Sequence, residues 1–407
     1  MTSRILDGPP PVAGAESLPA HVARLGALPL SRDPGQVIAA LDAAGLLGRG
    51  GAGYPVGRKW RSVAERSSGS AAVLVNGAEG EPLSAKDRTL MALRPHLVVD
   101  GALLAARAVG ADEIVFYIGK AHAAAGRAMA TALAERRRTD VPVRVVAAPS
   151  TYVAGEESAA VHFVDAGDAR PTTTPPRPFE RGLAGRPTLV QNVESLAHAA
   201  LIGRFGDGWY REAGRGETRG TGLVTITGAP VAGVREIELG TTIAEVAAES
   251  KLNRGDIEAV LLGGYFGGWT EASQAWDLPL DPAEMRRSAR GFGCGVVAFL
   301  GHDNCGVRAT ARIIDYMAGQ SAAQCGPCVF GLRAIADATA RLSSGAAERD
   351  DLARIERWSS QLVGRGACRH PDGAVGLVAS ALGVFGHEFA IHQRTGGCSR
   401  PARAQAA

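Results

Sequence analysis

The chain has 407 residues, a length that predicts two or three domains rather than one small core. Hydrophobic residues make up 46% and charged residues 21%, which is typical of a globular protein and excludes a largely disordered one. The net charge of +3 gives no electrostatic reason to expect a nucleic-acid or membrane-surface partner. No apolar run approaches the ~18–20 residues of a membrane span, and the start lacks an apolar signal core. We therefore expect a cytoplasmic protein with no direct membrane span.

Residues 1–30 are rich in Pro, Ala and Gly, and we expect a flexible N-terminal arm. An alternation of strands and helices follows, with strand-like runs at 71–76, 113–119 and 143–149 and helix-like runs at 96–110 and 121–138. This alternation predicts an α/β domain over 31–215, built on a Rossmann-like doubly wound parallel sheet. Such sheets bind ligands at the carboxyl ends of their strands.

The rest of the chain divides into a strand-rich part and a helical part. Residues 216–300 contain strand-like runs around one helix, which predicts a small α+β unit. Residues 301–395 predict a four-helix bundle, with helices at about 304–322, 328–344, 347–363 and 373–393. Residues 396–407 are a tail.

The glycine cluster at 48–53 is the first candidate binding motif. Gly48, Gly50 and Gly53 have G-x-G-x-x-G spacing, but they follow a helix rather than a strand, so a plain flexible turn is an equal explanation. Three basic residues on the same segment favour phosphate binding beside bare backbone amides: Arg49, Arg58 and Lys59.

Two acidic loops are the next candidates. NGAEGEP at 76–82 directly follows a predicted strand, so Asn76, Glu79 and Glu81 would stand where ligands bind, although a solvated turn is the commoner meaning. In YVAGEESAA at 152–160, Glu156 and Glu157 begin a predicted helix. Taken alone, ordinary capping of that helix explains them better than a ligand site does.

All six cysteines lie in the last third of the chain, at positions 294, 305, 325, 328, 368 and 398. In a cytoplasmic protein they indicate metal, cluster or thiol-redox chemistry rather than disulfides. The motif CGPC at 325–328 allows three interpretations. A thioredoxin-type dithiol needs a strand before it, and here the flanking segments are helical. The others are zinc held by Cys325, Cys328, Cys368 and His370, and an iron–sulfur cluster held by the three cysteines.

Five motifs in one order carry a family resemblance: GRGGAGYPVGRKW, NGAEGEP with KDRTLM, YVAGEESAA, PPRPF with GRPTLVQNVESL, and SAAQCGPCVFGL. Together they resemble the NADH-binding flavoprotein subunit of respiratory complex I (the F subunit of NADH:quinone oxidoreductase) and the related diaphorase subunits. The resemblance covers about 35–395. It implies a Rossmann-like FMN and NADH domain, a β-grasp insert of the soluble-ligand-binding type, and a helical bundle with a [4Fe–4S] cluster.

The resemblance also implies roles for individual residues. Those expected at the FMN phosphate are Gly48, Arg49, Gly50, Gly51 and Lys59. Those expected along the flavin and its ribityl chain are Asn76, Glu79, Tyr152, Gly155, Glu156, Glu157 and Asn192. Glu81 and Glu157 would lie near the nicotinamide as the catalytic pair, and Tyr54 would stack on the adenine.

Several positions depart from the family pattern. Ala78 replaces an acidic residue, and three positions where the family has NADH contacts hold Ser62, Thr174 and Arg177. Ala322 replaces the first cysteine of the cluster motif, which leaves three matching thiolates, Cys325, Cys328 and Cys368. Three thiolates can hold a [3Fe–4S] cluster, or a [4Fe–4S] cluster with one unusual ligand. Cys294, Cys305 and Cys398 are candidates for that ligand, and we expect Cys305, which opens the helix before the motif.

The implied function is transfer of a hydride from NAD(P)H to FMN and of single electrons to the cluster. The expected partner is a [2Fe–2S] thioredoxin-like subunit or a ferredoxin-type acceptor. The alternative is an FMN and iron–sulfur relay, or a structural subunit of a redox complex, that does not itself oxidise NADH.

Overall fold

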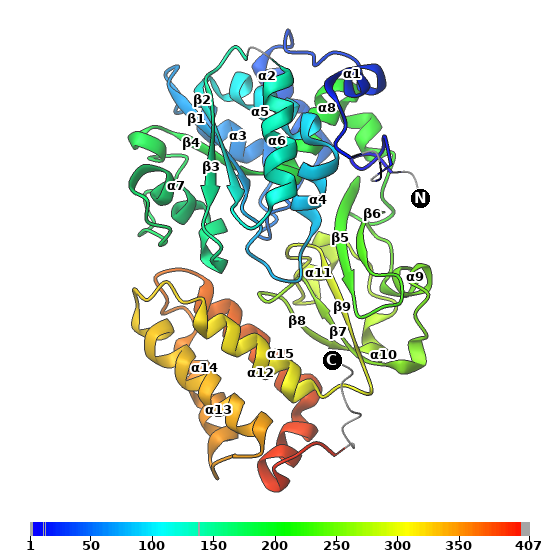
Figure 1. Cartoon of the computed structure of the whole chain (residues 1–407), viewed down its shortest axis with the longest axis vertical. Coiled ribbons are helices and arrows are strands. Elements are labelled where there is room, and N and C mark those ends of the chain that lie inside the picture. Colours follow the sequence, from blue (N-terminus) through cyan, green and yellow to red (C-terminus); the bar gives the residue numbers. More distant parts are fainter. Residues whose placement is uncertain (1–2, 11, 13, 137–138, 400–407) are drawn as a thin grey trace. The chain divides into compact units, whose positions relative to one another are not determined.

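The computed structural model describes residues 3–10, 12, 14–136 and 139–399 (Figure 1). The chain forms two compact units. The first comprises Met1–Thr225, Val234–Thr241 and Pro279–Glu284, and the second comprises Ile226–Gly233, Thr242–Leu278 and Met285–Ala407.

A four-stranded parallel sheet forms the centre of the first unit. Its strands are β1 (Ala71–Gly77), β2 (Ala111–Gly119), β3 (Val143–Ala148) and β4 (Thr188–Asn192), in the order β3-β2-β1-β4. The structure thus confirms the predicted parallel sheet. The sequence had indicated β1, β2 and β3 but not the five-residue β4.

Helices cover both faces of this sheet, and the side chains of β1 alternate between them. Ala71, Val73 and Val75 belong to a core that includes side chains of α2, α3, α5, α6 and α8. Ala72 and Leu74 belong to a second core, against side chains of α7. The helices of this unit are α1 (Leu18–Leu25), α2 (Pro34–Ala44), α3 (Val56–Ala64), α4 (Lys86–Leu93), α5 (Pro95–Val109), α6 (Ala123–Glu135), α7 (Glu157–Ala166) and α8 (Val193–Arg211).

Part of the expected flexible arm, residues 3–10, is held to the first unit by buried contacts. The side chain of Ile5 is fully buried, and its backbone amide donates to Glu236 Oε2 at 3.0 Å. The guanidinium of Arg94 donates to the carbonyls of Leu6 at 2.8 Å and Pro9 at 2.7 Å. Buried partners of this kind hold a chain end that composition alone marks as loose.

Strands β7 (Ile257–Leu262), β8 (Gly268–Glu271) and β9 (Val296–Gly301) of the second unit are antiparallel, with β7 in the middle. Strands β5 (Thr221–Thr227) and β6 (Gly233–Glu238) are neighbours and contribute residues to both units. Short helices accompany them: α9 (Ile243–Glu249), α10 (Ala272–Ala275) and α11 (Pro282–Arg287).

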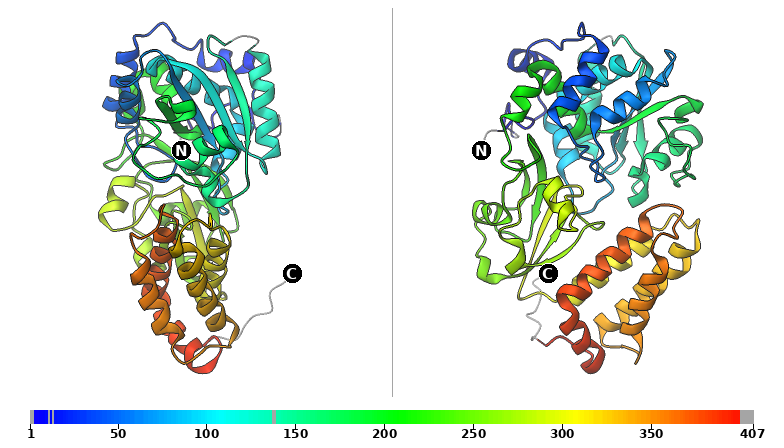
Figure 2. Two further views of the ribbon diagram at one scale, coloured as in Figure 1. Left: turned by 90° about the vertical axis from the view of Figure 1, so that its left-hand side faces the viewer. Right: turned by 180° about the vertical axis from the view of Figure 1, so that it is seen from behind.

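Four helices complete the second unit: α12 (Gly306–Gly319), α13 (Arg333–Ser344), α14 (Asp351–Leu362) and α15 (His370–Thr395). Each packs against the next, and α15 returns to α12 (Figure 2). A π-helical turn over Pro327–Leu332 leads into α13.

Helix α15 is also long and apolar enough to cross a membrane by length and composition alone. Helices α4 and α5, bent by 97°, would make a second such segment if counted together. The apolar stretch of α15 is interrupted by His387 and Glu388. Within the second unit, α15 packs against α12 and α14, with Leu377, Ala381 and Phe389 buried.

Candidate functional site

The glycine loop lies against the carboxyl end of β4. The loop is closed at its base, where the amide of Gly48 donates to the carbonyl of Tyr54 at 2.9 Å. A Cβ atom on Gly50 would lie 3.3 Å from Cβ of Asn192, which is tighter than ordinary contact. Gly51 has a φ of +110°, which other residues rarely adopt. The loop therefore needs glycine at position 51 for its conformation, and at position 50 it leaves little room for a side chain beside the strand end.

Asn76 and Asn192 lie opposite each other in register at the carboxyl ends of β1 and β4. The chain leaves β1 for β2 on one side and later returns to β4 on the other, so this is the switch point at which α/β sheets bind ligands. Asn76 Nδ2 donates to the carbonyl of Gly155 at 2.8 Å. Asn192 Oδ1 accepts from the amide of Glu194 at 3.0 Å, capping α8.

The two acidic loops meet at the same edge. A Cβ atom on Gly80 would lie 2.6 Å from the carbonyl oxygen of Tyr152, so glycine is required for this approach. The hydroxyl of Tyr152 donates to Glu81 Oε2 at 3.1 Å, and Glu81 is buried.

Lys59 and Glu157 form an ion pair beside these loops, with Nζ 2.8 Å from Oε2. Both side chains are partly exposed, at 23% and 27%. The guanidinium of Arg177 lies 3.8 Å from the other oxygen of Glu157. Two residues predicted for separate ends of the cofactor, Lys59 and Glu157, are thus in direct contact.

Glu79 and Glu156 both cap helices. Glu79 accepts from the amides of Asp87 at 2.9 Å and Arg88 at 3.0 Å, at the start of α4. Glu156 accepts from the amides of Ser158 and Ala159 at 2.9 and 3.0 Å, at the start of α7. Ordinary capping therefore explains Glu156, and the carboxylate of Glu79 is engaged in the same way. Both residues shape the loops that carry the other site residues.

Arg49 does not present its charge to the loop, contrary to prediction. Its side chain is buried, and Nη2 donates to the carbonyl of Thr221 at 3.0 Å and the hydroxyl of Tyr210 at 3.3 Å. Its amide donates to Ser195 Oγ at 2.9 Å. A buried guanidinium needs such partners. Arg49 therefore anchors the glycine loop to the interior of the first unit instead of binding phosphate.

The sequence analysis did not predict a buried network of charged side chains that involves Lys86, Asp87 and Glu194. Lys86 Nζ lies 2.6 Å from Asp87 Oδ1 and 2.9 Å from Glu194 Oε2. Burial raises the pKa of Asp87 to about 7. The nearby carboxylates of Glu79 and Glu194 act in the same direction, and the ammonium of Lys86 acts against it. Burial also opposes ionisation of Glu194, yet Lys86 and other neighbouring groups lower its pKa to about 2. Because Asn192 Nδ2 donates to Asp87 Oδ2 at 2.7 Å, this network fixes the amide at the sheet edge. Its only sequence signal is the Lys-Asp pair in the KDRTLM run.

The second unit brings Cys325, Cys328 and Cys368 together. Burial raises the pKa of Cys328 to about 12, and the nearby thiols of Cys325 and Cys368 act in the same direction. The hydroxyl of Ser321 hydrogen-bonds to Cys328. A helix and a loop precede CGPC, and a π-helical turn begins within it at Pro327, which excludes the strand context of a thioredoxin-type dithiol. His370, the residue considered for zinc, has Nε2 2.7 Å from the carbonyl oxygen of Met317.

The expectation that Cys305 completes the cluster was wrong. Cys305 caps the start of α12, whereas the CGPC turn follows its end, and a 14-residue helix is about 21 Å long. Its sulfur lies 3.4 Å from His392 Nε2, which also lies 3.2 Å from the sulfur of Cys398. The thiol of Cys294 hydrogen-bonds to the carbonyl of Gly263 at 3.2 Å. The helix predicted at about 304–322 already implied this separation.

Comparison with known proteins decides the family. Residues 41–200 match the Nuo51 FMN-binding domain, and residues 308–392 match the NADH-ubiquinone oxidoreductase-F iron-sulfur binding region. The NADH-quinone oxidoreductase F subunit of Aquifex aeolicus is 30% identical over 384 residues, which cover 90% of this chain and 88% of that protein. The chain belongs to the family of NADH-quinone oxidoreductase F subunits. The mitochondrial NADH dehydrogenase [ubiquinone] flavoprotein 1 of Dictyostelium discoideum is also 30% identical, over 87% of this chain and 78% of its own length.

A solved structure extends the similarity to the fold. The match is to an NAD+-reducing [NiFe]-hydrogenase, with a TM-score of 0.81 and 28% identity over 90% of this chain. The chain spans 64% of that hydrogenase chain.

The two matched regions confirm the expected cofactors, FMN and a [4Fe–4S] cluster. The residues present fit both groups. A loop whose glycines leave backbone amides bare, beside Lys59, suits a phosphate. Three neighbouring thiols, among which burial and the other two thiols oppose the ionisation of Cys328, suit a cationic cluster that neutralises them.

Proposed function

We propose that this protein is the NADH-oxidising flavoprotein subunit of an electron-transfer complex. It would receive a hydride from NADH and pass single electrons to its iron–sulfur cluster. When bound, FMN supplies the conversion between two-electron and one-electron chemistry. The observation that carries the proposal is the meeting of the glycine loop, Asn76, Asn192 and both acidic loops at one switch point of a parallel sheet.

The chain's own residues would bind and orient the flavin. Backbone amides of Gly50 and Gly51 would hold its phosphate, together with the ammonium of Lys59, while Gly48 closes the base of the loop. Asn76, Asn192 and Tyr152 would face the ribityl chain and the ring. Their rigidity comes from the hydrogen bonds to Gly155, Asp87 and Glu81.

Glu81 and Glu157 would orient the nicotinamide. Hydride transfer needs no side chain as acid or base, so positioning is their task. The Lys59 ammonium has three protons and can serve both a phosphate and Glu157. Tyr54, with 53% of its surface exposed, is available to stack on an adenine.

We assign domains on the same basis. Residues 31–215 would be the FMN and NADH domain, 216–300 a β-grasp domain of the soluble-ligand-binding type, and 301–395 the iron–sulfur bundle. The antiparallel strands β7, β8 and β9 and the packing of α12 to α15 support the last two assignments.

Cys325, Cys328 and Cys368 would each ligate one iron of the cluster. Ala322 leaves the fourth iron without the cysteine that the family pattern supplies. The hydroxyl of Ser321 already contacts Cys328, so we assign its oxygen as the fourth protein ligand.

The expected electron acceptor is a [2Fe–2S] thioredoxin-like subunit or a ferredoxin-type protein in the cytoplasm. Phe330 follows Cys328 by two residues, and 75% of its surface is exposed. Large exposed aromatic side chains are typical of interaction surfaces, so this residue would mark the docking point beside the cluster.

An anaerobic titration of the reconstituted protein with NADH and with NADPH tests the function. We expect NADH to bleach the visible absorbance of the flavin. No bleaching by either nucleotide would remove the dehydrogenase assignment.

The second candidate is an FMN and iron–sulfur relay that does not oxidise NADH. Its support is the loss of family nucleotide contacts at Ser62, Thr174 and Arg177, the last of which lies near Glu157. Reduction of the flavin by a reduced ferredoxin but not by NADH would favour it.

A further inference from the structure

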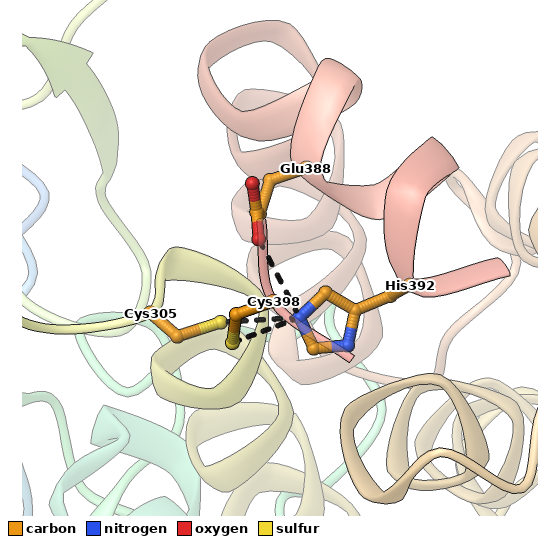
Figure 3. A group of neighbouring side chains, drawn as sticks. All are labelled: Cys305, Glu388, His392 and Cys398. Carbon is orange, nitrogen blue, oxygen red and sulfur yellow. Dashed lines mark hydrogen bonds and ion pairs between the residues drawn. The ribbon is translucent and has the colours of Figure 1, made fainter. Parts of the chain in front are cut away.

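A second group of metal-ligating side chains lies at the start of α12, away from the cysteines assigned to the cluster. Cys305 immediately precedes α12, Glu388 and His392 lie one turn apart on α15, and Cys398 follows α15 (Figure 3). One ligand atom from each lies within 4.8 Å of every other. Neither the FMN site nor the iron–sulfur assignment uses any of the four.

The imidazole ring of His392 is held in the orientation that metal binding requires. Its side chain is fully buried, and Nδ1 lies 2.8 Å from the carbonyl oxygen of Leu342. A carbonyl only accepts, so Nδ1 carries the proton and Nε2 presents its lone pair to the group. This backbone contact fixes the tautomer and the ring orientation, as outer contacts of metal-bound histidines do.

The distances suit tetrahedral zinc. Zn–S of about 2.3 Å and Zn–N of about 2.0–2.1 Å place the sulfur and nitrogen atoms about 3.5 Å apart. His392 Nε2 lies 3.4 Å from the sulfur of Cys305 and 3.2 Å from that of Cys398. Glu388 Oε1 lies 3.8 Å from Nε2, and all four ligand atoms lie within 4.8 Å of one another, so small side-chain movements would complete the site.

The carboxylate of Glu388 is held in place by contacts outside the group. It accepts from the amide of Ser399 at 2.7 Å and from its hydroxyl at 2.6 Å.

We propose that Cys305, Cys398, His392 and Glu388 bind one structural zinc ion. Two thiolates and an imidazole select zinc over the hard cations magnesium and calcium, and four protein ligands leave no open position for catalysis. Binding would release the thiol protons of Cys305 and Cys398 and form four bonds to the metal. The ion would tie the segment after α15 to the start of α12.

Metal analysis of the full-length protein, purified from zinc-supplemented cells, tests this proposal. We expect one zinc per chain in the wild type and at least a tenfold loss of zinc in Cys398→Ser, with iron content unchanged. Cys294→Ser is the matched control and should keep its zinc. Because Cys398 lies after the last helix, Cys398→Ser should fold, which circular dichroism can verify.

Replacement by cobalt gives a second, spectroscopic readout. Cobalt bound in this site should show thiolate-to-metal charge-transfer absorption that disappears in Cys398→Ser and in His392→Gln. Three results would overturn the proposal: a zinc-free wild type, a Cys305–Cys398 disulfide in the purified protein, or zinc that is lost in Cys325→Ser but kept in Cys398→Ser.

Discussion

The ammonium of Lys59 on α3 lies 2.8 Å from the carboxylate of Glu157 at the start of α7. The pair joins the glycine loop segment to the second acidic loop. A phosphate beside Lys59 would share the ammonium with Glu157, and the two residues should therefore have separable effects on flavin and nucleotide.

Removing the charge of Lys59 should weaken FMN binding. A hydrogen bond to a charged group contributes about 1.5–3 kcal/mol, so Lys59→Met should raise the dissociation constant of FMN about 10- to 100-fold. Recovery of flavin fluorescence on dilution measures this. Arg107→Met, which removes an exposed charge on α5, is the control. Equal FMN affinity in both variants would contradict the role of Lys59.

Neutralising Glu157 should leave the flavin bound. Glu157→Gln keeps a hydrogen-bonding side chain and frees Lys59, so FMN affinity should stay the same or rise. Nucleotide oxidation should fall at least tenfold, because the nicotinamide loses a positioning carboxylate. Steady-state rates with an artificial acceptor, set against flavin content, separate the two effects. A variant that loses its flavin and keeps its rate per flavin would contradict this assignment.

A methyl group in the glycine loop should exclude the flavin. The Cβ atom of Gly50→Ala would lie 3.3 Å from Asn192, on the loop that is expected to hold the phosphate. We expect at least a tenfold loss of FMN content at nearly unchanged folding stability. Gly126→Ala on α6 is the matched control, since nothing lies within 4 Å of the added atom. Helix propensity should stabilise that variant by up to about 1 kcal/mol.

The fourth cluster ligand can be tested by two opposite substitutions. Ser321→Ala should release one iron and give the EPR signal of an oxidised [3Fe–4S] cluster, because that iron loses its protein ligand. Ala322→Cys restores the family motif and should yield a cluster that resists iron loss. An unchanged EPR spectrum in Ser321→Ala would contradict the assignment of Ser321.

Acid stability should depend on Asp100. Burial opposes ionisation of this carboxyl, but His21, Arg136 and Arg204 lower its pKa from 3.8 to about 2. The stabilisation is therefore complete above pH 4 and is lost as the pH falls toward 2. The shift corresponds to about 2–3 kcal/mol. Asp100→Asn should lower the free energy of unfolding by about this amount at pH 6. The difference from wild type should shrink at pH 2.5, and a constant difference would argue against titration as the cause.

The features that could be predicted from the sequence are those that depend on residues close together in the chain. The parallel sheet could be predicted because β1 and β2 are continuous apolar runs. Strand β4 was not predicted, because five residues ending in Gln191 and Asn192 give too weak a hydrophobic pattern. Its partner β1 is also distant in the chain.

Side-chain direction and long-range contacts could not be predicted. Arg49 lies on the glycine loop, yet its guanidinium points into a buried network with Glu194. The pairing of Lys86 with Glu194 joins two helices that only the folded sheet brings together. Cys305 as a cluster ligand was inconsistent with the predicted helix between it and CGPC, and α12 shows that separation.

The most direct test of the account is the number of electrons that NADH delivers to the anaerobic protein. The wild type should take up about three electrons per chain, two at the flavin and one at the cluster, with an EPR signal from the reduced cluster. Cys368→Ser, which removes a cluster ligand, should take up about two and show no such signal. A wild type that stops at two electrons, or that takes up none, would contradict transfer from NADH through FMN to the cluster.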